Sequence, residues 1–288
     1  MPTQPTTKIA LYRTQHRTEG VKKVLELLDF PTVQDKHVVL KPNFNTADPT
    51  PASTHNDTLR QLVLELQGRG ASAITLGERS YQRFEEVIEQ KGVDGLAAKL
   101  GFDIVNLERD NKTLCQRDDL HWEEGFYVPR TITEAEYIVS TCCLKTHGYG
   151  GVFTMSLKLS VGILPERHMS ELHGSDHMRD MIAEINLAYS PDLIVLDGIE
   201  AFIDGGPSQG TVRNGDVMLA GTDRVAVDAV GVTILKDLGS NRVDGKIFQQ
   251  EQIRRVVELG IASRVWNRLN FSPQTSQVVS MPKGCDRF

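Results

Sequence analysis

The sequence contains little cysteine, few aromatic residues and no surplus of positive charge. Its 288 residues include four cysteines, and aromatic residues make up 6% of the chain. The cysteines form no CxxC pair and no zinc-ribbon spacing. Scarce aromatic side chains disfavour stacking platforms for single-stranded nucleic acid. The net charge of −6 argues against general nucleic-acid binding, which usually requires a basic surplus.

Several familiar sequence patterns are missing as well. No run is long and apolar enough to span a bilayer, and the N-terminal MPTQPTTK has no apolar core of the kind found in signal peptides. We therefore expect no membrane partner and, by default, a cytoplasmic protein. The chain contains no GxSxG, HExxH, GxxxxGK[ST] or GxGxxG pattern, which disfavours serine hydrolase and zincin chemistry and gives no P-loop or Rossmann fingerprint.

Apolar runs of strand length alternate with stretches of helical periodicity. The runs YIVS at 137–140 and LIVL at 193–196 are continuous, which is typical of strands covered on both faces. This alternation indicates an α/β fold with a largely parallel (mixed) sheet flanked by helices in three layers. Residues 1–288 then form a single domain or two lobes, and residues 270–288 form a loop-like tail. The expected strands are 9–12, 37–40, 73–76, 102–106, 137–144, 193–196 and 217–220, with a further extended segment at 126–131. The expected helices are 19–28, 58–67, 84–91, 96–100, 152–164, 176–189, 225–235 and 247–259.

The stretch 137–164 has an unusual distribution of charge. An apolar strand at 137–144 leads directly into Lys145 and His147, which share one face if the strand continues. In the apolar helix expected at 152–164, Lys158 is the only charged residue. Burying an unpaired ammonium costs several kcal/mol or removes its proton, so Lys158 requires a carboxylate, a bound anion or a catalytic task. The alternative is that Lys158 extends its head group to solvent.

Polar side chains follow several of the expected strands. In a parallel sheet the carboxyl ends of the strands meet at one edge, where ligand sites of open α/β sheets lie. We therefore expect a shared site at this edge, against the alternative of unrelated loop residues. The polar side chains at these ends are Lys41, Asn43, Glu78, Lys145, His147, Asp197 and Asp223.

The cationic residues indicate what such a site would bind. Lys41, Lys145 and Lys158 could hold a carboxylate or a phosphate, or transfer protons with a lowered pKa. His147 titrates near neutrality and is a candidate general acid, general base or metal ligand. A small-molecule anion is therefore the expected partner.

The acidic residues and the glycines have two interpretations each. Asp197, Asp204 and Glu78 could neutralise the lysines or bind a hard cation. The turn at 148–151 could present backbone N–H groups to an anion, or it could be a tight turn that needs glycine for its geometry.

Three histidines cluster in HMSELHGSDH, at His168, His173 and His177. The last two are four residues apart, as metal-binding pairs on a helix often are. Because Gly174 and Ser175 place a helix start between them, we favour surface or loop histidines. Ser175 is a candidate cap for the helix that follows.

The adjacent Cys142 and Cys143 would point to opposite faces of their strand, so they are not expected to bridge each other. Buried free thiols are the favoured interpretation. The alternative is that Cys143 faces the same pocket as Lys145.

The pattern CLKTH at 143–147, followed by a Gly-rich turn and FTMSLKLSVGILP at 153–165, resembles the domain of unknown function 362 family. Many members of this family resemble fusions to a ferredoxin-like module with CxxCxxC runs. The present chain lacks such a run, so no iron–sulfur cluster is expected in it. Further stretches of resemblance are KPNFN at 41–45, LGERS at 76–80, LDGI at 196–199, DGGPSQG at 204–210 and DRVAVDAVG at 223–231.

Combined with the resemblance, these observations give a set of candidate residues. The resemblance makes His173 the most relevant of the three clustered histidines. The expected catalytic residues are Lys145, His147 and Lys158. The expected substrate-binding residues are Lys41, Asn43, Glu78, Gly150, Gly151, Thr154, Asp204 and Gly206, and the candidate metal ligands are Asp197 and His173.

Three functions are compatible with this set. The leading hypothesis is an enzyme that acts on a small carboxylate or phosphate by Lys/His acid–base chemistry, for example in a racemase- or isomerase-like reaction, with a divalent metal as an open option. The second, which the ferredoxin modules of similar proteins imply, is a redox or metallocofactor protein that takes electrons from a separate partner. The third is a non-catalytic protein that binds an anionic metabolite or cofactor.

Overall fold

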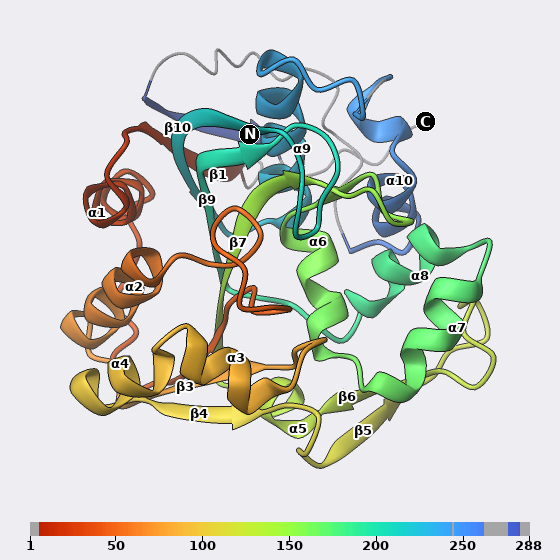
Figure 1. Ribbon diagram of the computed structural model, residues 1–288, viewed down its shortest axis with the longest axis horizontal. Helices are drawn as coiled ribbons and strands as arrows, with labels where there is room; N and C mark the ends of the chain where they lie inside the picture. Colours follow the sequence, from red (N-terminus) through yellow and green to blue (C-terminus); the bar gives the residue numbers. More distant parts are fainter. Residues whose placement is uncertain (1–5, 244, 262–275, 283–288) are drawn as a thin grey trace, which may run out of the picture.

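The computed structural model describes residues 6–243, 245–261 and 276–282. Its centre is a nine-stranded sheet in the order β11-β1-β10-β9-β7-β2-β3-β4, with β8 paired to β7 (Figure 1). The strands are β1 Thr6–Arg13, β2 His37–Lys41, β3 Ala73–Glu78, β4 Asp103–Asn106, β7 Tyr137–Thr146, β8 Phe153–Thr154, β9 Leu193–Phe202, β10 Val212–Gly221 and β11 Gln277–Pro282.

The sheet is mixed and mostly parallel, as the sequence predicts. Strands β9, β7, β2, β3 and β4 are joined by parallel pairings, in which Leu40 is in register with Leu76 and Val139 with Leu193. Strands β10, β1 and β11 complete the other side through antiparallel pairings. The continuous apolar runs therefore belong to strands that are buried on both faces.

Helices cover both faces, which gives the expected three layers (Figure 1). On one face α1 to α4 pack against β2, β3 and β7, with Leu25, Leu62 and Val87 in the shared core. On the other face α6 and α9 pack against β7 and β9, and α8 and α10 lie beside them. The helices are α1 Arg17–Leu27, α2 Asn56–Gly68, α3 Phe84–Gln90, α4 Val93–Leu100, α5 Arg130–Thr133, α6 Ser156–Leu159, α7 Met169–Gly174, α8 Met178–Ile185, α9 Arg224–Asp237 and α10 Glu251–Glu258.

Several expected elements differ from the structure. The segment 152–164 is not one helix, because Phe153–Thr154 forms β8 and helical structure begins at Ser156. The helix expected from residue 176 begins at Met178, and Ser175 ends α7 instead of capping α8. The segment 247–259 splits into the 3-10 turn Ile247–Gln249 and α10. The tail 270–288 is not wholly loop-like, since β11 lies in it; 270–275 and 283–288 are outside the described residues.

A small antiparallel hairpin lies apart from the main sheet. Strand β5 Lys112–Cys115 pairs with β6 Phe126–Pro129, which confirms the first part of the extended segment expected at 126–131; α5 begins at Arg130. Within the described ranges, no helix has the length and apolar character that crossing a bilayer requires.

Candidate functional site

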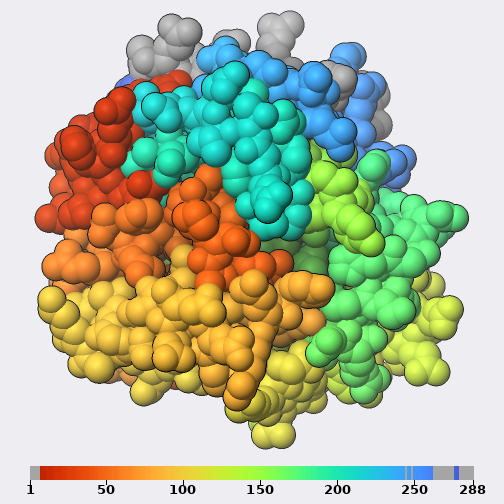
Figure 2. All heavy atoms as spheres, in the orientation of Figure 1, coloured from red at the N-terminus to blue at the C-terminus, as the bar shows by residue number. Residues whose placement is uncertain are grey.

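A pocket of about 880 Å³ opens at the carboxyl ends of β2, β3 and β7. Figure 2 shows the hollow where the orange, yellow-green and cyan segments meet. The position agrees with the rule that ligand sites of open α/β sheets lie at this edge. Of the residues singled out in the sequence, the pocket is lined by Lys41, Asn43, Glu78, Lys145, His147, Thr154, Lys158, His173 and Gly206.

Lys158 is the most unusual residue of the pocket. It is 6% exposed, so its side chain does not extend to the outer surface, and it lines the pocket instead. Among the described residues, its ammonium has no hydrogen-bond or ion-pair partner. Burial, and then the charge of Lys145, lower the pKa of Lys158 to about 8. A cation in this state is stabilised by any anion that enters the pocket.

Lys145 lies beside it near the end of β7, also buried. Its Nζ donates to the carbonyl oxygens of Ala52, at 2.5 Å, and Pro207, at 3.1 Å. Burial lowers the pKa of Lys145 to about 8. Asp48 is the nearby carboxylate that opposes this lowering, and it lines the pocket while it accepts a hydrogen bond from Thr46. Lys145 is thus oriented by carbonyl groups that leave its positive charge largely uncompensated.

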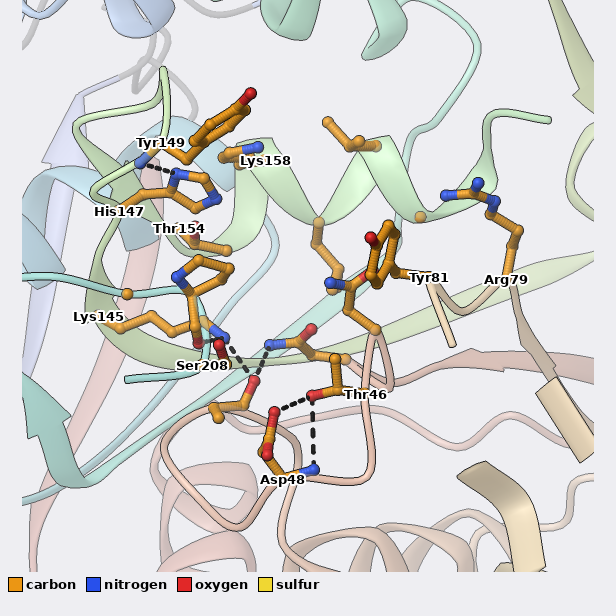
Figure 3. A pocket seen from close by; sticks show the side chains of 18 of the residues that line it. Thr46, Asp48, Arg79, Tyr81, Lys145, His147, Tyr149, Thr154, Lys158 and Ser208 are labelled. Atoms are coloured by element: carbon orange, nitrogen blue, oxygen red, sulfur yellow. Dashed lines mark hydrogen bonds between the residues drawn. The ribbon is translucent and has the colours of Figure 1, made fainter. Parts of the chain in front are cut away.

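His147 presents a neutral imidazole to the pocket. Its Nδ1 lies 3.1 Å from the backbone N–H of Tyr149 and accepts a hydrogen bond from it, so the proton of the neutral ring is assigned to Nε2 (Figure 3). Burial, followed by the charges of Lys158 and Lys145, lowers the pKa of His147 to about 2. The ring is therefore a hydrogen-bond donor at neutral pH.

Thr154 joins these donors through the pairing of β8 with β7. Its register partner is Lys145, which places the hydroxyl next to the lysine. The Thr154 Oγ1 is buried and has no hydrogen-bond partner in the described part of the chain. Together, the two ammonium groups, the imidazole N–H and the hydroxyl form a wall of donors that suits an anion.

A buried ion pair between Lys41 and Glu78 also lines the pocket. Lys41 Nζ donates to Glu78 Oε1 at 2.7 Å, and Glu78 also accepts the backbone N–H groups of Phe44 and Arg79. Burial lowers the pKa of Lys41 and raises that of Glu78, while the attraction between the two groups opposes both changes. A Cβ at Gly162 would come within 2.8 Å of Lys41 Nζ, so the glycine allows the chain to cross directly over the pair. Lys41 lines the pocket, but its charge is already matched.

The helix that carries Lys158 is held from the far side by Asp228 of α9. The Asp228 carboxylate accepts the backbone N–H groups of Ser156, at 2.7 Å, and Leu157, at 3.0 Å. Helix α6 is short and its first residues have no cap of their own. This buried side chain therefore supplies the acceptors that the helix start requires.

Asp197 and Asp204 lie outside the pocket lining, contrary to expectation. Strand β9 does not end at Asp197 but continues to Phe202. Asp197 is buried and accepts from Arg17 Nε at 2.8 Å and Thr58 Oγ1 at 2.7 Å. A buried ion pair thus occupies Asp197, and the structure does not bring it together with His173, the other candidate metal ligand. Asp204 instead accepts from the N–H and hydroxyl of Thr211 and holds its own loop together.

The glycine turn does not form an anion cradle. The N–H of Gly148 donates to Gly206 O and that of Gly151 to Tyr149 O, and the turn leads into a strand. A Cβ at Gly206 would come within 2.1 Å of the Thr146 carbonyl oxygen, and one at Gly150 within 2.2 Å of the Met178 sulfur. The hydrogen bonds of Gly148 and Gly151 and the crowding at Gly150 favour the tight-turn interpretation of 148–151.

Of the clustered histidines, His173 and His177 are exposed, as expected, whereas His168 is buried, contrary to expectation. His173 lies in α7 and lines the pocket, with its Nδ1 2.7 Å from the Met169 carbonyl oxygen. His177 lies at the start of α8, so the two are not on one helix. His168 is buried, and its Nε2 accepts the backbone N–H of Tyr127.

Cys142 and Cys143 are buried free thiols, as favoured. Burial raises the pKa of Cys142 well above its usual value and that of Cys143 to about 11. Neither lines the pocket, although Cys143 is close enough to Lys145 for the two to influence each other. Cys285 lies outside the described residues.

The opposite wall of the pocket is the part that sequence reasoning missed. Figure 3 shows Arg79 and Tyr81 across the pocket from Lys145 and His147. Arg79 lies within the stretch LGERS that carries the family resemblance. It directly follows the last residue of β3, and no periodic pattern in the sequence distinguishes it from other loop residues. Other lining residues that were not predicted include Asn45, Thr46, Asp48 and Gln82.

Comparison with known proteins relates the chain to a sequence relative, to a solved structure and to a protein family. A thylakoid-associated protein from Synechocystis sp. is 25% identical over 206 residues, which are 69% of this chain and 63% of that protein. The lactate racemase apoprotein from Thermoanaerobacterium thermosaccharolyticum has a related fold, with a TM-score of 0.50 and 15% identity over 76% of this chain and 55% of that one. The chain thus spans less than two thirds of either protein. The family model described as Domain of unknown function (DUF362) matches residues 38–233. With more than half of its length matched by that model, the chain belongs to the DUF362 family.

Proposed function

We propose that the chain is an enzyme for a small anionic molecule, a carboxylate or a phosphate, in whose reaction Lys145, His147 and Lys158 take part. The observation that carries this proposal is the buried ammonium of Lys158, which has no partner in the described structure. A protein that buries a charge in this way loses stability unless a ligand compensates for it. The volume of the pocket, about 880 Å³, is sufficient for such a ligand.

The donors suggest how the anion would be held. Lys145 and Lys158 are mostly protonated at pH 7, since their pKa values are about 8. They would bind the anionic oxygens together with the Thr154 hydroxyl and the His147 Nε2–H. Because the imidazole is neutral, it donates a hydrogen bond without adding a third cation.

The same residues are suited to proton transfer. A lysine with a pKa of about 8 exchanges its proton close to neutral pH, which an ordinary lysine does not. We therefore assign Lys158 to give or take the proton at the carbon next to the anionic group. Lys145 would hold the anion and, through its charge, keep the pKa of Lys158 low.

The opposite wall indicates a ligand longer than the anionic group alone. Arg79 and Tyr81 face the cationic wall across the pocket (Figure 3), and the amide side chains of Asn43, Asn45 and Gln82 also line it. A second polar or anionic group on the substrate would be placed at Arg79. Replacement of Arg79 should therefore weaken binding of extended anions more than that of inorganic phosphate.

A hydrogen-exchange experiment tests the proposal. The chain is incubated in D₂O with 2-hydroxy acids, including lactate, and with 2-oxo acids, and loss of the proton next to the carboxylate or carbonyl is followed by NMR. We expect exchange on at least one acid, abolished in Lys158→Met and retained in Lys99→Met, which removes an exposed lysine of α4. Exchange at the wild-type rate in Lys158→Met would contradict the assignment of Lys158. Saturable binding with no exchange would favour the non-catalytic alternative.

A further inference from the structure

A second group of side chains, away from the pocket, has the composition of a metal site. His121, His177 and Asp180 each offer one ligand atom, and these atoms lie within 4.8 Å of one another. His121 lies in the connection between β5 and β6, whereas His177 and Asp180 are at the start of α8. None of the three lines the pocket described above.

His121 is oriented by a buried carboxylate. Its Nδ1 lies 2.6 Å from Glu184 Oε1, and its backbone N–H donates to Glu184 Oε2 at 2.9 Å. Glu184 is 0% exposed and is held in turn by Arg255. With the proton on Nδ1 shared with the carboxylate, the lone pair of Nε2 is left free. A carboxylate behind the imidazole in this way is typical of histidines that bind metal ions.

The side chains of His177 and Asp180 make only long contacts with charged neighbours. His177 is 59% exposed and stacks on His121 with ring centroids 4.3 Å apart. Its Nδ1 is 3.9 Å from Asp180 Oδ2, which is too long for a hydrogen bond. Asp180 Oδ1 is buried without a hydrogen bond, and the guanidinium of Arg254 approaches it only to 3.6 Å. An oxygen left in this state is a natural ligand for a cation.

We propose that His121, His177 and Asp180 bind a divalent transition-metal ion, for which zinc is the best match. Two imidazoles and one carboxylate suit zinc, whereas magnesium and calcium prefer oxygen ligands. Three protein ligands leave a fourth position for water. The side chain of the exposed His177 can rotate, which would shorten the distances between the three ligand atoms to those found around zinc.

The ion would link the β5–β6 connection to α8. This helix also touches the turn that leads into the pocket, because Met178 lies against Gly150. Helix α7, which carries His173 into the pocket lining, directly precedes it. The metal would therefore stabilise the part of the molecule behind the cationic wall without taking part in the chemistry there.

Titration of zinc chloride into the metal-stripped chain tests this proposal. Calorimetry should give one zinc ion per chain, and the thermal unfolding midpoint should rise. The variant His177→Ala should bind zinc at least about tenfold more weakly and lose the rise, since it removes one of three ligands. Replacement of His16, an exposed histidine at the start of α1, serves as the control and should change neither result.

The result that overturns the proposal is equally specific. Zinc binding that is unchanged in both His177→Ala and Asp180→Asn would place the ion elsewhere, and absence of stoichiometric binding to the wild type would exclude the site. His177 is exposed and Asp180→Asn is nearly isosteric, so both variants should fold. Far-UV circular dichroism without zinc checks that they do.

Discussion

The Asp228 carboxylate binds the backbone N–H of Ser156 at 2.7 Å, and thereby fixes the start of the helix on which Lys158 lies. The two residues are 72 positions apart in the sequence. This contact connects α9, on the outer layer, to the pocket at the edge of the sheet. The position of the least compensated lysine in the pocket thus depends on a carboxylate that does not line the pocket.

Removal of Asp228 should therefore impair both folding and binding. Asp228→Ala leaves two buried N–H groups without acceptors, and we expect a loss of about 3 kcal/mol in the free energy of unfolding. Asp228→Asn should reduce the free energy of unfolding by less. Burial raises the pKa of Asp228 to about 7, so about half of the side chains are already neutral at pH 7. Urea denaturation compares the two variants. Equal stability of wild type and Asp228→Ala would contradict this role.

Replacement of Lys158 by Met should make the ligand-free protein more stable. A pKa of about 8 in place of 10.5 corresponds to about 3 kcal/mol of destabilisation of the charged form at neutral pH. Because the folded pKa is the lower one, the unfolded chain binds the extra proton between pH 8 and 10.5, and this penalty fades as the pH rises through that range. The advantage of Lys158→Met, measured by urea denaturation, should thus be larger at pH 7 than at pH 10. An advantage independent of pH would show that the Lys158 ammonium is not strained.

Anion affinity should depend on pH in the same range. Lys145 and Lys158 bind an anion in their protonated forms, so affinity should fall as the pH rises above about 8. His147 has a pKa of about 2 and remains neutral, so no change in affinity is expected near pH 6.5. Calorimetric titration with inorganic phosphate at constant ionic strength, corrected for the second ionisation of phosphate, measures this profile. A decline centred near pH 6.5 would indicate that the histidine supplies the charge.

Asp197 should matter for stability and not for binding. Asp197→Asn breaks a buried ion pair with Arg17, a change that typically costs about 3 kcal/mol. The variant should unfold more easily yet bind phosphate with wild-type affinity under conditions in which it is folded. Loss of phosphate affinity in a folded Asp197→Asn protein would show that Asp197 contributes to anion binding.

The sequence predicts much of the fold because the apolar runs are long and regular. Strands β2, β3, β7 and β9 begin where their apolar runs begin, and Lys41, Lys145 and His147, at the carboxyl ends of β2 and β7, do meet in one pocket. A single lysine in an apolar segment was a visible sign of burial. The same sign is present at Asp228, a carboxylate in an apolar helix.

What the sequence could not provide were the partners of these charges. Asp197 is bound by Arg17, 180 positions away, and no local pattern reveals that pair. The extension of β9 past Asp197 depends on its antiparallel partner β10, with which residues up to Phe202 are in register. Arg79 and Tyr81 reach the pocket through the course of a loop, which has no periodicity to read.

The most direct test of the anion site is calorimetric titration of the metal-stripped wild type and of Lys145→Met, Lys158→Met and Lys99→Met with inorganic phosphate and with lactate at pH 7. We predict saturable binding of at least one of these anions, at one site per chain. Each pocket variant should weaken that binding at least tenfold, and Lys99→Met should leave it unchanged. Failure of both anions to bind the wild type, or equal affinity in all four proteins, would contradict the assignment of this pocket as an anion site.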